Sequence, residues 1–451
     1  MSVNSLPPLV DFQTQWIESQ GTDLFNPEAL QLEAALEFMQ AYTANRRHTL
    51  GTETIPLESA LGRVLHKDMI ALMDVPPADN SAMDGFAFHS QALHQANPIS
   101  LDIIGTRLAT SADSTDAKNQ EIKSTNTVVF DPSQHAYRIM TGAVMPAGCD
   151  TVIPQEFTEQ IQQTIGFDPR RIQAGDNRRL QGEDLRIGTV CIPKGRIIGP
   201  SDMGLIASMG FSTIGVYKKL TVAIFSTGDE LKALGSELTP GAIFDSNRYT
   251  LLGMLQNLGV NTIDLGIIPD HPEALRNAFA SAASLADAII TSGGVSVGQA
   301  DFTKQVMREL GDVAFWTLAI KPGRPMAFGK IKQNQHEAVL FGLPGNPVAV
   351  MITFYQFVQD TLNWMGGASN FKQLIHQAHW VGKFKKRSGR TEFLRGFLHQ
   401  NTAGLNCVEP IGNQGSGVLS SMSQANCLVI LPPELTQVED GDLVNIVAIQ
   451  R

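Results

Sequence analysis

Four short runs of small, hydroxyl-bearing and acidic residues each follow an apolar segment that is typical of a buried strand. The carboxyl ends of parallel strands meet on one side of a sheet, and open α/β sheets bind their ligands there. Any one run could serve only the geometry of a turn, but all of them together indicate a binding site. The runs are Ser226-Thr227-Gly228-Asp229-Glu230, Pro269-Asp270, Ser292-Gly293-Gly294-Val295-Ser296-Val297-Gly298 with Asp301, and Gly342-Leu343-Pro344-Gly345-Asn346-Pro347.

The run at 292–298 has the composition of an anion-binding loop. Its glycines let backbone N–H groups approach a ligand, its serines add hydroxyl donors, and the helix expected after it would direct its positive end to the same place. The run matches neither the phosphate-binding loop of the ATPases nor the glycine fingerprint of dinucleotide-binding proteins. The sequence therefore predicts an anion site of another kind.

Carboxylates among the same runs would repel a phosphate unless a cation neutralises them. Proteins bind Mg²⁺ through one or two carboxylates together with phosphate oxygens. A phosphate, several carboxylates and Mg²⁺ together indicate phosphoryl or nucleotidyl chemistry. The carboxylates concerned are those of Asp229, Glu230, Asp270 and Asp301.

Basic residues surround two proline-containing turns in IKPGRPMAFGK, namely Lys321, Arg324 and Lys330. They could hold a phosphate together, or they could be exposed side chains of a hairpin. We favour a third interpretation, in which Lys321 alone matters because Pro322-Gly323 fixes the backbone beside it.

The most polar of the candidate loops is DNSAMDGFA, at residues 79–87. Asp79 and its polar neighbours can satisfy backbone groups in a tight bend, and Gly85 can supply an unusual φ. We expect Met83 to be the buried anchor of this loop, and Asp84 to be the residue that the loop presents.

The middle of the chain alternates apolar strands with helices, which predicts a parallel α/β sheet with right-handed crossovers and helices on both faces. Short alternating segments before and after it indicate β-rich parts. The predicted division is a flexible extension (1–25), a linking domain (26–67 and 180–218), a β-rich inserted module (68–179), a central α/β domain (219–367) and a small C-terminal β domain (368–451).

Composition and charge exclude several classes of function. The 451 residues carry a net charge of −10 and a pI near 5.5, whereas proteins that bind nucleic acids usually have a basic surface. The sequence contains no run of about 18 apolar residues, which is the length that a membrane-spanning helix needs. The N-terminus lacks the pattern of a secretory signal. The cysteines are far apart, which is typical of free thiols in a reducing cytoplasm.

Taken together, a series of motifs resembles the bacterial molybdopterin molybdenumtransferases and the C-terminal enzyme domain of gephyrin. The resemblance runs over roughly residues 26–450. The motifs, in order, are DNSAMDGFA, RIMTGAVMP, GEDLRIG, FSTGDEL, FDSNR, LGIIPD, SGGVSVGQADFTK, FWTLAIKPGRPMAFGK and GLPGNPVAV.

The resemblance implies a fold and an activity. The central domain would have the molybdopterin-binding fold, shared with the molybdopterin adenylyltransferases. Enzymes of this family insert molybdenum from molybdate into adenylylated molybdopterin and release AMP in the presence of Mg²⁺. They are homodimers whose active site lies between the α/β domain of one subunit and the DNSAMDGFA module of the other. The implied partners are the adenylyltransferase and the apoproteins of molybdoenzymes.

Site residues carry over position by position. The resemblance implies catalytic roles for Asp84, Thr141, Asp184, Glu230, Asp270 and Lys321, and we expect Asp301 and Glu230 to bind Mg²⁺. The cofactor-binding set comprises Ser292, Gly293, Gly294, Ser296 and Gly298 of the anion loop, with Pro344, Pro347, Arg395 and Ser416. Phe86 stands where the family commonly has tyrosine, and Thr317 where it often has lysine.

Two other functions remain open at this point. A molybdopterin adenylyltransferase would resemble the α/β domain alone, so the additional N- and C-terminal parts argue against it. A scaffold protein could keep the fold without the chemistry, because a fold does not settle a function. The presence of Asp84, Glu230, Asp270, Asp301 and Lys321 argues against that alternative.

Overall fold

The computed structural model describes residues 8, 11, 29–48, 50–94, 98–109, 129–295, 302–369 and 371–449. Apart from residues 8 and 11, the predicted extension at 1–25 lies outside this part of the chain. The chain divides into two compact units. Unit 1 comprises residues 1–67, 194–200 and 213–451, and unit 2 comprises residues 68–193 and 201–212.

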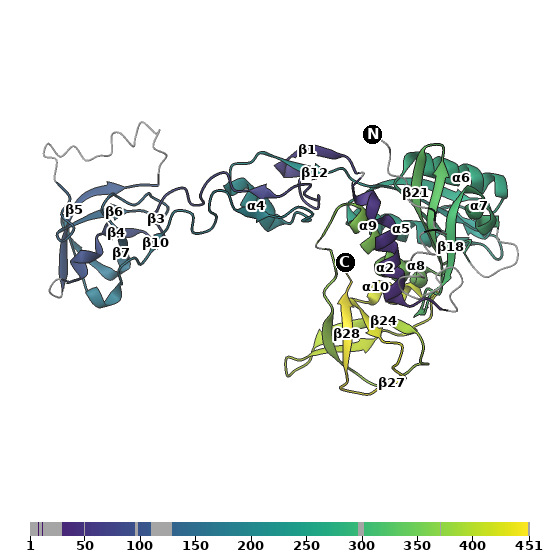
Figure 1. Ribbon diagram of the computed structural model, residues 1–451. Helices are drawn as coiled ribbons and strands as arrows, with labels where there is room; N and C mark the ends of the chain where they lie inside the picture. The colour runs from purple at the N-terminus through teal and green to yellow at the C-terminus, as the bar shows by residue number, and fades with distance from the viewer. Residues whose placement is uncertain are drawn as a thin grey trace. The chain divides into compact units, whose positions relative to one another are not determined.

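The centre of unit 1 is a mixed β-sheet between two layers of helices (Figure 1). Four of its strands pair in parallel, and β20 pairs antiparallel with both β21 and β18. The strand order is β16 (Asn261–Ile268), β13 (Thr221–Thr227), β17 (Ala288–Ser292), β21 (His336–Leu343), β20 (Pro325–Gln333) and β18 (Gly311–Thr317).

The sequence-based expectation of a parallel sheet is therefore correct for four strands and wrong for this antiparallel extension. Short connections join β18 to β20 and β20 to β21, and short connections can join only antiparallel neighbours. Part of IKPGRPMAFGK, which the sequence suggested to be a basic turn, belongs to strand β20.

Alternating side chains of β13 bind the two helical layers to the sheet. Ala223 and Phe225 pack on the layer of α6 (Pro272–Leu285) and α7 (Phe302–Leu310). Val222 and Ile224 belong to the core on the other face. The helices of that face are α2 (Leu32–Thr43), α5 (Ser246–Leu258), α8 (Pro347–Thr353) and α9 (Gln359–Met365), and a π-helical turn, Phe354–Val358, connects the last two.

The last part of unit 1 is a closed β-barrel. Its strands are β24 (Thr391–Gln400), β25 (Asn406–Pro410), β22 (His376–Trp380), β28 (Leu443–Ala448) and β26 (Cys427–Leu431), and a further pairing of β24 with β26 closes the ring. The short strand β19 (Ile320–Lys321) adds to β24 in parallel, so that Lys321 lies opposite Glu392. This barrel confirms the predicted C-terminal β domain.

Unit 2 is built on a mixed sheet of short strands (Figure 1). Their order is β7 (Thr151–Pro154), β4 (Gly85–Phe88), β6 (His135–Ile139), β5 (Ile99–Arg107), β9 (Thr164–Phe167) and β8 (Thr158–Ile161). Phe88, Leu101 and Phe167 lie in its core. Gly85 is required on the central strand β4, because a Cβ there would collide with the backbone oxygen of Ile153. The predicted β-rich module is therefore confirmed.

No helix in the described part of the chain is long and apolar enough to cross a membrane.

Candidate functional site

Asp84 lies directly before β4 in unit 2, and its carboxylate is exposed and firmly oriented. Oδ1 accepts a hydrogen bond from the backbone N–H of Thr141 at 2.7 Å and another from the Thr141 hydroxyl at 2.8 Å. These bonds, the backbone bond first, lower the pKa of Asp84. Among the described residues, none donates to Oδ2. Asp84 therefore presents an ionised carboxylate with one oxygen fixed and the other open.

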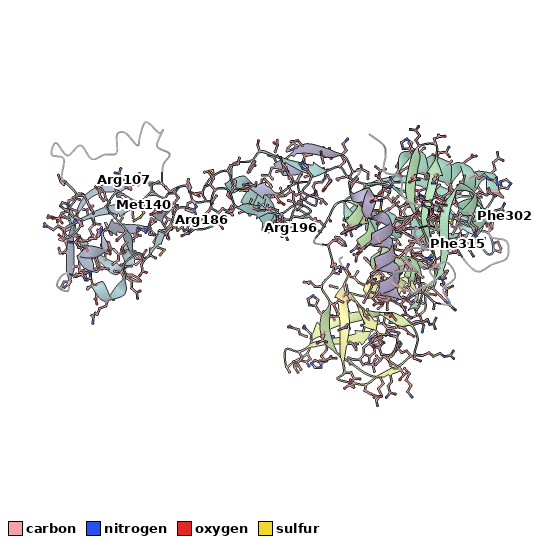
Figure 2. All side chains as sticks on the ribbon, viewed as in Figure 1. Arg107, Met140, Arg186, Arg196, Phe302 and Phe315 are labelled. Carbon is pink, nitrogen blue, oxygen red and sulfur yellow. The ribbon has the colours of Figure 1, made fainter. Side chains whose placement is uncertain are left out.

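Backbone hydrogen bonds hold Thr141 in place. The N–H of Met140 donates to the oxygen of Arg107 at 3.1 Å, and Figure 2 labels both residues. Gly142, at φ +80°, donates to the oxygen of Ser81 at 2.8 Å, and the Ser81 N–H donates to Ala143 at 3.0 Å. The MTGA turn and the DNSAMDGFA loop are thereby bonded to each other, although about 60 residues separate them in the chain.

The prediction that Met83 is the buried anchor of the DNSAMDGFA loop is wrong. Met83 is 41% exposed, whereas Ser81 and Phe86 are buried. The Ser81 hydroxyl donates to the backbone oxygen of Met83 at 2.5 Å, which closes a tight turn. Phe86 packs in the core of unit 2. A buried hydroxyl and an aromatic ring therefore anchor the loop.

Asp79 and Asp184 lie in unit 2 as well. The Asp79 carboxylate accepts from the N–H of Gln181 at 2.7 Å and lies 3.6 Å from the Arg178 Nε, so it secures the chain at 178–181. Asp184 is exposed, and its N–H donates to the oxygen of Val75 at 3.1 Å. Within the described residues, no hydrogen bond joins Asp184 to Asp84 or Thr141.

What we call the carboxyl rim comprises the carboxyl ends of β13, β16, β17 and β21 in unit 1 and the segments that follow them. Of the predicted residues, it holds Glu230, Asp270, Ser292, Gly293, Gly294, Pro344 and Pro347. Asn247, in the first turn of α5, joins two of these segments. Its Nδ2 donates to the Ser292 Oγ at 2.8 Å and to the Gly345 oxygen at 2.7 Å. The N–H of Gly293 donates to the oxygen of Leu343 at 3.2 Å. The structure thus brings together the SGG turn and the GLPGNP loop.

Asp245 determines where Asn247 lies. Its buried carboxylate caps α5 by accepting from the Arg248 N–H at 3.2 Å. The same oxygen accepts from the Ser226 hydroxyl at the end of β13, at 3.1 Å. Sequence reasoning missed both Asp245 and Asn247 as site residues, although both stand in the motif FDSNR. The available signal was the pair Asp245-Ser246 directly before a helix pattern, because aspartate and serine favour the start of a helix.

The glycines of the SGG turn are required by its geometry. Gly293 has φ +93° and Gly294 has φ +67°, a region that other residues rarely adopt. A Cβ on Gly293 would lie 2.5 Å from the Thr227 oxygen, and one on Gly294 would collide with the Thr303 hydroxyl. Ser296, Gly298 and Asp301, which were also predicted, lie outside the described residues.

Carboxylates gather at the carboxyl rim. The Asp270 N–H donates to the Asp229 carboxylate at 3.4 Å, which joins the segments after two neighbouring strands. The Glu230 carboxylate folds against Gly228, where an added Cβ would lie 2.6 Å from its Oε2. No cluster of three metal-ligating side chains occurs in the described part of the chain. Mg²⁺ held mainly by phosphate oxygens needs only one or two carboxylates, which this rim offers.

Lys321 lies at the junction with the barrel. Its Nζ is 3.2 Å from the Oε2 of Glu392, whose side chain is only 2% exposed, whereas that of Lys321 is 51% exposed. A buried carboxylate therefore holds an accessible ammonium group. Glu392, which lies outside the motifs quoted above, was not predicted.

Lys330 does not belong to the same basic group. Its side chain is fully buried, with Nζ 3.4 Å from Glu337 Oε1 and 3.7 Å from Asp312 Oδ2. Burial lowers its pKa. It lies opposite Val339, three residues before Gly342 on β21, and so away from the carboxyl rim. The interpretation of Lys321, Arg324 and Lys330 as one phosphate cluster is therefore wrong.

Arg395 is completely buried in the barrel, and burial lowers its pKa to about 10. Its Nε donates to Ser421 Oγ at 3.0 Å, and its Nη2 donates to the Gly415 oxygen at 3.1 Å. The next residue, Ser416, accepts from the N–H of Val348 at 3.1 Å. Arg395 thus holds a loop that contacts the start of α8, directly after the GLPGNP segment.

Three family models match successive parts of the chain. The model of the MoeA N-terminal region (domain I and II) matches residues 30–210, that of a probable molybdopterin binding domain matches residues 223–364, and that of the MoeA C-terminal region (domain IV) matches residues 379–449. The fold and the matches together define a multidomain protein built around a molybdopterin-binding domain.

Known relatives match along most of their own length. A molybdopterin molybdenumtransferase of Haemophilus influenzae is 40% identical over 397 residues, which cover 88% of this chain and 93% of that protein. One of a Nostoc species is 33% identical over 395 residues, with coverages of 86% and 87%. A crystal structure of the molybdopterin biosynthesis moeA protein from Pyrococcus horikoshii has a TM-score of 0.74 at 26% identity, with coverages of 94% and 100%. The chain belongs to the molybdopterin molybdenumtransferase (MoeA) family.

Proposed function

We propose that the protein is a transferase that inserts molybdenum from molybdate into adenylylated molybdopterin and releases AMP. The observation that carries this proposal is the carboxyl rim, where Asn247 joins the SGG turn and the GLPGNP loop within a domain that matches the molybdopterin-binding model. The matches to both flanking MoeA regions favour the molybdenum-inserting reaction over adenylyl transfer.

At the rim, we assign phosphate binding to the turn of Ser292, Gly293 and Gly294. Its positive φ values turn the backbone sharply before α7, whose first residue, Phe302, is labelled in Figure 2. Helix N-termini and glycine turns both favour anions. Ser296 and Gly298 would extend the loop, and Pro344 and Pro347 would shape the opposite wall. Lys321 supplies an accessible positive charge for the same anion.

Mg²⁺ would be held by Glu230 and Asp301, with Asp270 beside them. When bound, the cation would neutralise phosphate charge and orient the AMP that leaves. Arg395 would act indirectly, since its guanidinium is buried and holds the loop of Ser416. Asp84, fixed by Thr141, would act on the reacting end of the substrate, and Asp184 would lie in the same module.

Several features of the proposal concern the whole protein. We propose a cytoplasmic homodimer in which Asp84 of one subunit completes the carboxyl rim of the other. The adenylyltransferase that supplies the substrate and the apoproteins that receive the product would be its partners. The five-part division of the chain, with boundaries at 25, 67, 179, 218 and 367, belongs to the same proposal.

The decisive experiment supplies the purified protein with adenylylated molybdopterin, molybdate and Mg²⁺, and measures AMP by chromatography. We expect AMP release that requires both molybdate and Mg²⁺. Folded protein that releases no AMP would refute the proposal. A parallel reaction with ATP and free molybdopterin tests the adenylyltransferase alternative, and activity there alone would favour it.

A further inference from the structure

A cavity of about 500 Å³ lies in unit 1 at the amino ends of the parallel strands. Leu220 and Val260, which line it, directly precede β13 and β16. The carboxyl rim lies at the opposite ends of these strands, so the cavity is separate from the site described above. Its volume lies within the range of sites that bind small molecules, about 300–1,000 Å³.

One wall of the cavity is a helical segment with an irregular turn. Tyr355, Gln359, Leu362 and Asn363 line the cavity at spacings that place them on one helix face. Tyr355 belongs to the π-helical turn Phe354–Val358, and Gln359 follows directly after this turn. Such turns are rare and occur frequently at functional sites.

Positive charge dominates the lining. Lys218, Lys219, Lys372 and Arg63 line the cavity, and none of its lining residues in the described part of the chain is acidic. Arg63 is neutralised by Glu53, whose Oε1 lies 2.5 Å from its Nη2. The three lysines have no carboxylate within ion-pair distance among the residues that the structure describes. A chain with a net charge of −10 thus places three lysines without such an ion pair around one cavity, although the Asp360 carboxylate acts on Lys372 from a greater distance.

Helix ends offset only part of this charge. Both α5 and α9 end at the cavity, and their carboxyl ends each carry the equivalent of about half a negative charge. The Asp360 carboxylate, which follows the lining residue Gln359, also acts on Lys372. Set against the three lysines, these negative charges leave an excess of about one positive charge. The rest of the lining is mixed, with the amides of Asn257 and Asn363 beside the apolar side chains of Met254 and Leu258.

We propose that this cavity binds a phosphorylated organic molecule. The lysines would pair with its phosphate, and the Tyr355 ring with the apolar side chains would accept a planar or apolar group. An inorganic anion would leave the apolar wall without a partner. This inference goes beyond the proposed reaction and does not depend on it, because none of the cavity residues belongs to the carboxyl rim.

The test uses the full-length protein with AMP as the probe, and adenosine and inorganic phosphate for comparison. Hydrogen exchange locates the binding, and calorimetry measures Kd. We expect AMP to slow exchange at residues 355–366 and 217–220. Exchange that slows only at 227–231 and 292–295 would overturn the proposal, since AMP would then bind the carboxyl rim alone. If inorganic phosphate slowed exchange equally, the proposal that the ligand carries an organic group would be overturned.

Charge-reversal variants test the role of the lysines. In Lys219→Glu/Lys372→Glu, we expect the Kd of AMP at the cavity to rise about 100-fold, roughly tenfold for each lost charged contact. The matched control is Lys385→Glu/Arg387→Glu, which changes the net charge equally at exposed positions of the barrel domain. An equal loss of affinity in the control would overturn the proposal. If the double variant unfolds, Lys372→Ala serves instead, with an expected loss of about tenfold.

Discussion

The Asp84 carboxylate accepts both hydrogen bonds that Thr141 can donate, at 2.7 and 2.8 Å, through a single oxygen. We predict that Asp84→Asn lowers the rate of AMP release about 100-fold, because a group acting directly on the reaction is lost. Thr141→Val, which keeps the backbone bond, should lower it about tenfold. Thr141→Ser retains the hydroxyl and serves as the control. Near-normal activity of Asp84→Asn would remove Asp84 from the site.

The proposed dimer with shared active sites makes a prediction about mixed subunits. Asp84→Asn and Glu230→Gln should each inactivate the enzyme, since each changes one side of every site. In a mixture refolded or co-expressed at equal amounts, half of the dimers carry both variants, and one of their two sites is intact. AMP release should therefore recover to about a quarter of the wild-type rate. No recovery in verified mixed dimers would place both residues in sites formed by one subunit.

Asn247 provides a test of how the carboxyl rim is positioned. Asn247→Ala removes both Nδ2 hydrogen bonds, so we expect KM for the adenylylated substrate to rise about tenfold and the free energy of unfolding to fall by about 1–2 kcal/mol. Gln256→Ala changes an exposed position of the same helix and should alter stability by less than about 0.5 kcal/mol. A change in stability without a change in KM would make Asn247 purely structural.

Substitution of Arg395 should affect the stability of the protein more directly than its catalytic activity. Lysine cannot reproduce the forked hydrogen bonds to Ser421 and to the 413–415 loop. We expect Arg395→Lys to reduce the free energy of unfolding by about 2–4 kcal/mol. The exposed Arg387→Lys is the matched control. A stable Arg395→Lys variant that has lost AMP binding would instead place the guanidinium in contact with substrate.

Asp360 makes stability depend on pH. Burial raises its pKa to about 6, and Lys372 offsets part of this rise. The unfolded chain loses this proton near pH 4, whereas the folded chain keeps it until about pH 6, so stability should fall as pH rises between these values. Asp360→Asn avoids the cost and should be about 1–2 kcal/mol more stable at pH 8, with a smaller advantage at pH 5. Urea unfolding at both pH values provides the measurement, and an equal advantage at both would contradict the assignment.

The sequence predicts most of the fold because its strands and helices differ strongly in pattern. It misses the antiparallel strands β18 and β20, since nothing local in IKPGRPMAFGK separates an exposed turn from a buried strand. Lys330 illustrates the difficulty, because a lysine is expected at the surface unless its partners, here Glu337 and Asp312, are known.

The candidate site also contains residues that the sequence predicts and residues that only the structure identifies. Residues in local motifs, such as Asp84 and the SGG turn, are recognisable from the sequence. Asn247 and Glu392 act through neighbours about 45 to 100 residues away, so only the folded chain identifies their partners. Met83 was misplaced because an apolar residue in a polar loop suggests burial, whereas here the buried Ser81 hydroxyl closes the turn.

The pairing of β24 with β26 has a consequence for assembly. Each of the five strands of the ring is paired on both sides, and β19 already occupies the free part of β24, so the ring offers little backbone edge on which another chain can add a strand. The barrel domain is therefore protected against strand exchange between copies and against fibril-like growth. A protein that binds the ring strands would contact their side chains and loops, so surface substitutions could change the specificity of that contact while the ring stays intact.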